Sequence, residues 1–266
     1  MMQLHICFIG FGHMARAMAQ GWSKQPTIKL SATAPSLPML INDKGISTHP
    51  DNSTFLGIAD IVILAVKPPV IKQVLAEIKP KLAASTLVVS IAAGITQQQL
   101  HQLCHPTQVV IRCMPNLPVA YGQGMVALQA GAAISSAHQN TLQTLFEALG
   151  HVVWVADDKA MHAFTALCGS GPAYVYYFIE SLTNAGIKLG LSTQTAKLGA
   201  TQTLKGALEL LQNQATDVTT LRQKVTSPGG TTAAGINKLV DEHFETTIYH
   251  ALKAAFLRAK ELEILP

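Results

Sequence analysis

Residues 5–21 read HICFIGFGHMARAMAQG, and this stretch decides the fold expected for the first half of the chain. It opens with a short apolar run, which predicts a buried strand, and it continues with apolar residues at helical spacing. Between the two, Gly10 permits a tight turn, Gly12 lets a pyrophosphate approach the backbone, and Ala15 lets the helix pack on the sheet. A strand that passes through G-x-G-x-x-A into a helix is the context of a dinucleotide-binding fingerprint, although a purely structural turn has the same pattern.

The residues that follow repeat this alternation of strand and helix. Four apolar runs rich in Val and Ile predict strands covered on both faces, as in a parallel sheet; they are residues 4–10, 61–66, 86–94 and 107–114. Helical patterns lie between them over residues 14–23, 70–78 and 97–103. Two more strands are expected at residues 124–131 and 151–157, with a helix near residues 136–149. The alternation predicts βαβ units with right-handed crossovers.

After about Asp157 the pattern changes to helices only. The expected helices cover residues 173–189, 195–212, 218–226, 231–240 and 243–262. We therefore predict an α/β fold with an N-terminal Rossmann-like, doubly wound sheet over residues 1–157 and a C-terminal all-helical domain over residues 158–266. The Ala- and Leu-rich helices of that second domain predict at least a homodimer.

Composition limits the function classes. The chain has 266 residues, of which 48% are hydrophobic and 13% charged, so disorder is excluded and buried surface in an oligomer is expected. The net charge of +4 comes from scattered basic residues, which gives no nucleic-acid footprint but suits an anionic ligand. Four cysteines without C-x-x-C spacing predict reduced thiols. With neither a membrane-spanning stretch nor a signal peptide expected, we predict a cytoplasmic protein without nucleic-acid or membrane partners.

The ends of the predicted parallel strands outline one crevice, where ligands of doubly wound sheets bind. An acid at the end of the second strand would favour NAD, but residues 29–42 contain none, while Thr33 and Ser36 offer hydroxyls to a 2′-phosphate. No arginine is present there to clamp such a phosphate. The missing acid and the two hydroxyls nevertheless favour NADPH, and use of NADH is the alternative. Lys67 follows another predicted strand, where it either faces a ligand in the crevice or is a solvated loop lysine. The small residues 90–95 leave room there for a flat ring.

A second motif, VTSPGGTTAAGI at residues 225–236, breaks one helix and begins another. Gly229, Gly230, Thr231 and Thr232 would direct free N–H groups outward at a helix start, where a small carboxylate can bind; a capped turn between helices is the alternative. His101 and His105 share the spacing of one helix face, but no further ligand lies near, so we expect no metal. The predicted sites would hold a dinucleotide and a small carboxylate, but they contain no strong acid or base. Such a site suits a substrate that accepts a hydride readily, such as a protonated imine.

The motifs together resemble the pyrroline-5-carboxylate reductase family. The resemblance rests on FIGFGHMARA, ADIVILAVKP, VVSIAAGIT, IRCMPNLP, GSGPAYVYYFIE and VTSPGGTTAAGI, which cover nearly the whole chain in the family's order. It implies NAD(P)H-dependent reduction of 1-pyrroline-5-carboxylate to L-proline, the last step of proline biosynthesis. It also implies a helical dimerisation domain and often a decamer of five dimers.

By this resemblance, the site residues fall into two groups. The coenzyme would lie over Gly10, Phe11, Gly12, His13, Met14, Thr33, Ser36, Asn52, Ala65, Val66, Lys67, Pro68, Ala92, Ala93 and Gly94. The substrate would bind at Ser227, Gly229, Gly230, Thr231 and Thr232, with the Thr232 hydroxyl on the substrate nitrogen as the catalytic group.

Two departures from the family pattern affect rate and coenzyme preference more than the reaction. His13 stands where the family usually has Asn, and residues 217–223, DVTTLRQ, replace a histidine-proline-glycine and leucine-lysine-aspartate pattern. Two other functions fit a similar design. One is a related imine or β-hydroxyacid dehydrogenase, and the other is a dinucleotide-binding protein that has lost catalysis.

Overall fold

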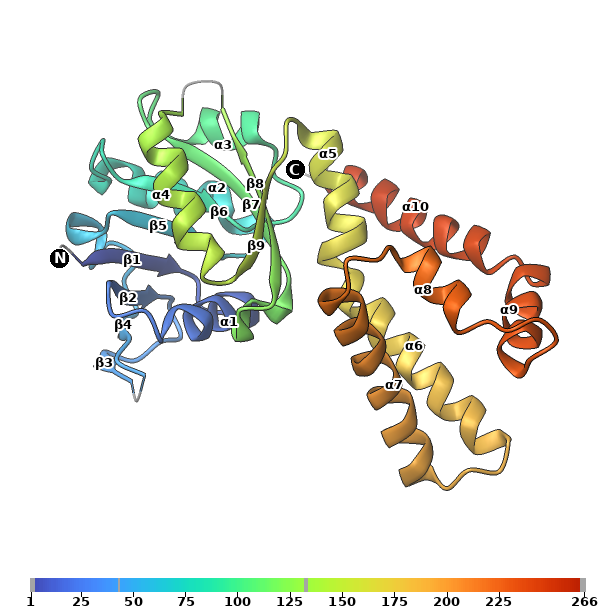
Figure 1. The fold of residues 1–266 in the computed structure, drawn as a ribbon. Helices are drawn as coiled ribbons and strands as arrows, with labels where there is room; N and C mark the ends of the chain where they lie inside the picture. Colours follow the sequence, from blue (N-terminus) through green and yellow to red (C-terminus); the bar gives the residue numbers. More distant parts are fainter. Residues whose placement is uncertain (1–2, 43, 132–133, 264–266) are drawn as a thin grey trace. The chain divides into compact units, whose positions relative to one another are not determined.

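A computed structural model describes residues 3–42, 44–131 and 134–263 of the chain (Figure 1). In these ranges the N-terminal half forms one mixed sheet with the order β3-β4-β2-β1-β5-β6-β7-β8-β9. Its strands are β1 (Leu4–Ile9), β2 (Ile28–Thr33), β3 (Leu40–Ile41), β4 (Ser47–His49), β5 (Ile61–Leu64), β6 (Leu87–Ser90), β7 (Val110–Pro115), β8 (Gly124–Ala130) and β9 (Gly150–Trp154).

Strand directions identify the sheet as doubly wound. The six strands β4-β2-β1-β5-β6-β7 run parallel, β8 pairs antiparallel with β7, and β9 returns parallel to β8. The Rossmann-like, doubly wound sheet predicted from the apolar runs is confirmed. The two-residue strand β3 and the three-residue strand β4 were not predicted. Leu40 and Ile41 are exposed at the sheet edge, and β4 has one buried residue, so neither forms an apolar run.

Helices cover both faces of this sheet. They are α1 (His13–Trp22), α2 (Ile71–Ile78), α3 (Gln97–Leu103), α4 (Ser136–Glu147) and α5 (Asp158–Phe164), joined by the short turns η1 (Leu56–Ile58), η2 (Pro68–Val70), η3 (Lys79–Lys81), η4 (Leu117–Tyr121) and the π-helical η5 (Thr165–Gly169). The core of one face joins α1 and α4, and that of the other joins α2 and α3 (Figure 1). Trp22 is fully buried against Phe146, and its indole N–H donates to the Leu145 carbonyl over 2.9 Å.

The chain divides into two compact units, one formed by Met1–Ser170 with Ala255–Pro266 and the other by Gly171–Ala254. The first, called the sheet unit below, holds the sheet, and the second is called the helical unit. The helical unit contains α6 (Gly171–Lys188), α7 (Thr193–Asn213), α8 (Val218–Lys224) and α9 (Thr231–Asp241), while α10 (Phe244–Leu262) belongs partly to each. The domain boundary that we expect near residue 157 from the sequence stays a prediction.

The π-helical turn that precedes α6 is held by a side-chain hydrogen bond within the sheet unit. Pro172 lacks an N–H, so the Cys168 carbonyl four residues earlier cannot receive its helical hydrogen bond. The Asn116 side-chain N–H group donates to that carbonyl instead, over 3.0 Å, and the Asn116 side-chain oxygen accepts from the Met125 backbone N–H over 2.8 Å. One buried amide thus links the end of β7, the start of β8 and the π-helical turn.

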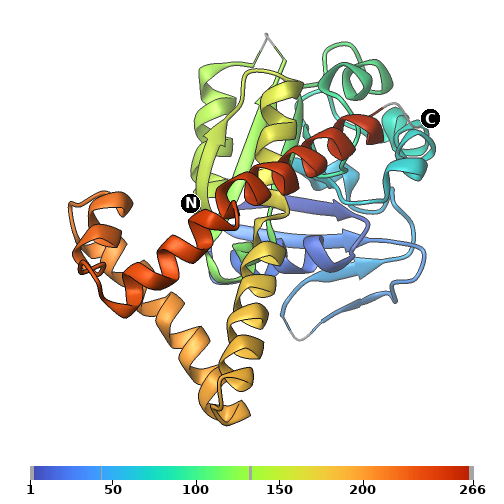
Figure 2. The same cartoon turned by 90° about the vertical axis from the view of Figure 1, so that its right-hand side faces the viewer.

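The end of α10 is fixed to the sheet unit by a buried charged cluster. Arg112 on β7 donates to Asp158 over 2.6 Å and lies 2.8 Å from Glu263, and the His162 ring lies 3.1 Å from the other Glu263 oxygen. Figure 2 shows this red end of the chain, where the Gln99 side chain of α3 donates to the Glu263 backbone carbonyl over 3.4 Å. A Cβ on Gly94 would lie 2.7 Å from the Leu262 carbonyl oxygen, so glycine is needed there for this close packing.

The helical unit has little core of its own. α6 and α7 lie side by side, and a Cβ on Gly186 would come within 3.3 Å of the Ala196 side chain, so small residues allow this approach (Figure 1). Many large apolar side chains remain outside: Tyr177 is 72% exposed, Leu189 87% and Tyr249 59%. Exposed apolar surface of this extent indicates an interface with another protein surface.

Candidate active site

The glycine turn after β1 has the geometry expected of a dinucleotide fingerprint. Gly10 has φ +84°, and a Cβ there would lie 2.8 Å from the Ala65 carbonyl oxygen, so no other residue fits without strain. Gly12 is different: it caps α1 in an extended conformation, and a Cβ on it would meet nothing within 4 Å. The chain itself gives no steric reason for glycine at position 12. Open space over the uncapped start of α1 is what an approaching phosphate group requires.

Three backbone hydrogen bonds bring the ends of four parallel strands together at this turn. The Gly10 N–H donates to the Thr33 carbonyl over 2.7 Å, the Ala65 N–H donates to Ile9 over 2.8 Å, and the Ile91 N–H donates to Leu64 over 3.0 Å. The predicted coenzyme residues after β1, β2, β5 and β6 therefore lie along one edge of the sheet. Lys67 is exposed at the start of η2, and Ala92 is buried after β6.

The hydroxyls expected to meet a 2′-phosphate differ in their surroundings. Thr33 is fully buried, and its hydroxyl donates to the Asn52 side-chain oxygen over 3.1 Å. Asn52, itself buried, donates in turn to Glu77 over 3.2 Å. Ser36 is exposed after β2. The Thr33 hydroxyl is thus engaged inside the protein, and of the two only Ser36 presents its hydroxyl to solvent.

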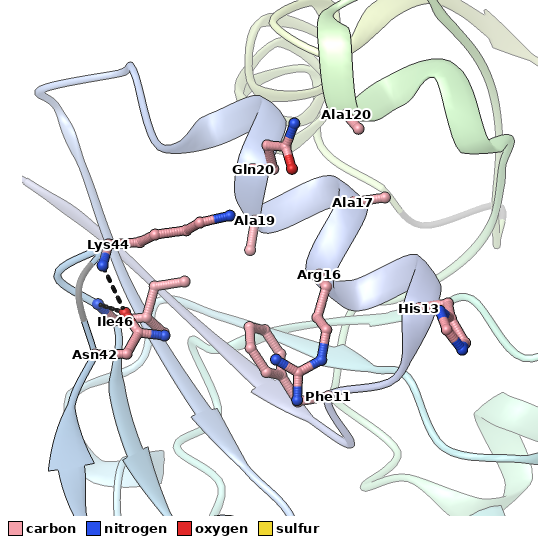
Figure 3. Close-up of a pocket in the computed structure, with 10 residues that line it drawn as sticks. All are labelled: Phe11, His13, Arg16, Ala17, Ala19, Gln20, Asn42, Lys44, Ile46 and Ala120. Carbon is pink, nitrogen blue, oxygen red and sulfur yellow. Dashed lines mark hydrogen bonds between the residues drawn. The ribbon is translucent and has the colours of Figure 1, made fainter.

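A cavity of about 380 Å³ lies beside the fingerprint, along α1 (Figure 3). Its walls come from α1 and from the segment before β4, and no carboxylate is among the described residues lining it: Phe11, His13, Arg16, Ala17, Ala19, Gln20, Asn42, Lys44, Ile46 and Ala120. Arg16, which the sequence analysis did not single out, is one of these lining residues, and its guanidinium lies 4.7 Å from the centre of the Phe11 ring.

The turn before α9 builds the second part of the site. Gly229 has φ +72°, and Gly230 caps α9 without a side chain, so no side-chain hydrogen bond covers the first N–H groups of this helix. Ser227, Thr231 and Thr232 are exposed around them. Upstream, Asp217 caps the start of α8. Its carboxylate accepts from the Thr220 hydroxyl over 2.7 Å and from the Thr220 and Thr219 backbone N–H groups over 3.0 and 2.9 Å, and these hydrogen bonds lower the pKa of its carboxyl. The altered segment before Ser227 therefore still starts a helix.

The two histidines of the HQLCH stretch do not share a helix face. α3 ends at Leu103, Cys104 is extended, and the His105 ring bonds Thr107 over 2.9 Å outside the helix. That expectation of a common face was wrong, because Pro106 prevents the helix from continuing. In the described ranges no group of three or more His, Cys, Asp or Glu residues could hold a metal ion. Nor does any helix within those ranges have both the length and the apolar character to cross a membrane.

The fold and this site define a dinucleotide-dependent oxidoreductase with a Rossmann-like sheet and a helical C-terminal part. Residues 5–94 match the family model described as NADP oxidoreductase coenzyme F420-dependent, and residues 158–262 match the model for pyrroline-5-carboxylate reductase dimerisation. Pyrroline-5-carboxylate reductase of Pseudomonas aeruginosa is 37% identical over 97% of this chain and 96% of its own length. The Pisum sativum enzyme is also 37% identical, over 96% of this chain and 94% of its own.

Solved structures agree with these relatives. The Plasmodium falciparum pyrroline carboxylate reductase, which has NADP bound, superposes with a TM-score of 0.89 at 32% identity, covering 99% of this chain and 100% of that one. The Coxiella burnetii pyrroline-5-carboxylate reductase gives 0.87 at 35% identity, covering 97% of each chain. The chain belongs to the pyrroline-5-carboxylate reductase family. The family, fold class and NAD(P)-dependent reductase function predicted from the sequence are confirmed, and the dimerisation model supports a homo-oligomer.

Proposed function

We propose that this chain reduces 1-pyrroline-5-carboxylate to L-proline with NADPH, and that its two groups of site residues hold coenzyme and substrate respectively. The observation that carries the substrate half is the turn before α9, where Gly229 is left-handed and Gly230 provides no side-chain cap. A helix start of this kind offers N–H groups and a positive dipole end to a small carboxylate. The family membership given above supports the reaction.

The sheet unit fits the coenzyme. The uncapped start of α1 and the open space over Gly12 suit a pyrophosphate, and Gly10 brings the neighbouring strand ends close. The coenzyme, when bound, supplies a hydride to the imine carbon. The residues proposed to hold it are Gly10, Phe11, Gly12, His13, Met14, Thr33, Ser36, Asn52, Ala65, Val66, Lys67, Pro68, Ala92, Ala93 and Gly94. Within this set Thr33 acts through its carbonyl, which fixes Gly10, and Gly94 packs against Leu262.

Thr232 is the residue proposed to meet the substrate nitrogen. Its hydroxyl can accept a hydrogen bond from the N–H of a protonated imine, and it keeps that partner when the nitrogen becomes an amine. The protonated imine is already activated, so the protein needs to orient the ring rather than supply a strong acid. Ser227 and the N–H groups of Gly229 to Thr232 fix the carboxylate end, and orientation of the reacting carbon provides most of the rate enhancement.

The proposed setting is a homo-oligomer in the cytoplasm. The large exposed apolar side chains of the helical unit support a second copy of the chain as their cover, and a decamer of five dimers is the assembly proposed from the family resemblance. The four free cysteines support a reducing compartment.

The test is a matrix of coenzyme and substrate combined with the substitution Thr232→Ala. Loss of one hydrogen bond to a charged nitrogen should lower turnover with pyrroline-5-carboxylate by about tenfold to a hundredfold, while Thr232→Ser retains it. Thr193→Ala is the matched control, because Thr193 is also exposed in the first turn of a helix of the same unit. Equal turnover in Thr232→Ala and Thr193→Ala would contradict the role of Thr232, and a wild-type chain inactive with both coenzymes would contradict the proposed function.

A further inference from the structure

The loop after β6, residues 91–95, packs against the end of α10, which is distant from it in the sequence. We propose that Gln99 and Glu263 are positioning residues that hold this loop in the conformation that receives the nicotinamide half of the coenzyme; the inference rests on the function proposed above. The loop carries three of the residues proposed to bind the coenzyme, namely Ala92, Ala93 and Gly94. Gln99 and Glu263 are outside that set, and they act through the loop.

The place of the loop in the sheet determines which half of the coenzyme it faces. A doubly wound sheet binds one half of a dinucleotide on each side of the point where the strand order reverses. The fingerprint turn follows β1, with β2 on one side of that strand and β5 and β6 on the other. Because the adenosine ribose binds toward the end of β2, the loop after β6 faces the nicotinamide half. This half is identical in NADPH and NADH.

The sheet holds the first part of the loop, and α10 contacts the second part. The Ala92 N–H donates to the Ser90 side-chain oxygen over 3.3 Å at the end of β6. Gly94 has φ +76°, and a Cβ there would lie 2.7 Å from the Leu262 carbonyl oxygen. The loop backbone therefore packs on the last residue of α10 with no side chain of position 94 between them. A shift of this end of α10 would change the space that Gly94 occupies.

Gln99 joins the start of α3 to the end of α10 through one side-chain amide. The amide oxygen accepts from the Thr96 backbone N–H over 2.8 Å, and the Thr96 hydroxyl accepts from the Gln99 backbone N–H over 3.1 Å, which forms a capping box. The amide N–H group of the same side chain donates to the Glu263 backbone carbonyl over 3.4 Å. Thr96 directly follows the loop, so this amide connects the end of the loop to α10.

Glu263 holds the same end of α10 through its side chain. One of its oxygens lies 2.8 Å from the Arg112 guanidinium, and the other lies 3.1 Å from the His162 ring. Arg112 is itself held by Asp158 over 2.6 Å, and the His162 ring packs edge-on against Phe256 of α10 with 5.8 Å between ring centres. All of these residues belong to the sheet unit. A buried polar network of this kind favours a single arrangement, so it fixes the end of α10 against the loop.

The experiment uses Gln99→Glu and Glu263→Gln in the full-length chain, at a temperature where circular dichroism shows both variants folded. Gln99→Glu keeps the oxygen that accepts from Thr96 and removes only the N–H donor to α10, so the capping box is retained. Glu263→Gln removes the charge that holds Arg112 and His162. The matched controls are Gln98→Glu, in the exposed first turn of α3, and Glu261→Gln, in an exposed ion pair of α10.

The expected result is a loss of affinity restricted to the nicotinamide half. If the loop is in the binding conformation for a tenth to a third of the time, the Kd for NADPH rises by about threefold to tenfold. The KM values for NADPH and NADH should rise by the same factor. The kcat at saturating coenzyme should stay within about twofold, because the bound state is unchanged. The Kd for 2′,5′-ADP, which lacks the nicotinamide half, should also stay within about twofold.

Unchanged NADPH binding in either variant overturns the role of that residue. An equal loss of affinity for 2′,5′-ADP overturns the proposal, because it indicates a general loosening of the sheet unit, and so does an equal loss in the control variants. The titrations need no substrate. A chain that shows the expected difference between NADPH and 2′,5′-ADP but reduces no pyrroline-5-carboxylate therefore supports this inference and contradicts the proposed function.

Discussion

Replacing Glu263 by Gln tests whether the buried cluster at the end of α10 stabilises the sheet unit. The Glu263 side chain is 12% exposed, and one of its oxygens lies 2.8 Å from the Arg112 guanidinium while the other lies 3.1 Å from the His162 ring. Glu261, two residues earlier, pairs with Arg258 over the same 2.8 Å but is 61% exposed. Glu263 and Glu261 can therefore be given the same Glu→Gln substitution at the same ion-pair distance. Glu263 tests a buried pair, and Glu261 is the matched control in a solvated pair.

The expected magnitudes follow from that difference in burial. Arg112 keeps its hydrogen bond to Asp158 when Glu263 becomes Gln, and the amide oxygen still fills the space. The loss is therefore smaller than the roughly 3–5 kcal/mol for breaking an isolated buried pair, and we expect about 2–3 kcal/mol. An exposed pair contributes about 0–1 kcal/mol, so Glu261→Gln should cost under about 0.5 kcal/mol. In a chain of this size, the loss of about 2–3 kcal/mol expected for Glu263→Gln lowers the melting midpoint by roughly 4–10 °C.

Tryptophan fluorescence during urea unfolding is the suitable assay. Trp22 and Trp154 are the only two tryptophans in the sequence, and both lie in the sheet unit that contains the cluster. Wild type, Glu263→Gln and Glu261→Gln should be compared at one protein concentration, because assembly makes the midpoint concentration-dependent. A Glu263→Gln midpoint no lower than that of Glu261→Gln would refute the stabilising role of the cluster.

Further predictions concern the fingerprint glycines and the thiols. Gly10→Ala should destabilise the sheet unit by about 2 kcal/mol or more, because its left-handed φ and a carbonyl oxygen 2.8 Å from the new Cβ add strain; an unchanged urea midpoint would contradict this. Gly12→Ala has open space, so it should keep the midpoint and weaken NADPH binding in a fluorescence titration. Burial raises the pKa of Cys7 and Cys104 to about 11, so few of these thiols are ionised at pH 8. Alkylation followed by mass spectrometry should label the partly exposed Cys168 first, and early labelling of Cys7 would count against the buried setting.

The features that could be predicted from the sequence are those with a local signal. Consecutive apolar residues predicted the buried parallel strands, the spacing of Gly10, Gly12 and Ala15 predicted the turn into α1, and Ser-Pro-Gly-Gly predicted the start of α9. Each of these follows from backbone conformation or from burial of a short segment, so neighbouring residues are sufficient to specify it. The motifs therefore predicted the fold class, the family and both halves of the proposed site.

Features that depend on contacts between distant segments became visible in the folded chain and not before. Thr33 and Ser36 are similar as hydroxyl residues, but only packing against Asn52 leaves the first engaged and the second exposed. The pairing of Arg112 with Glu263 joins residues 151 positions apart, and one cavity brings Arg16 of α1 together with Asn42 and Lys44. Such pairings have no local pattern in the chain, because they arise only when separate elements are packed on the same sheet.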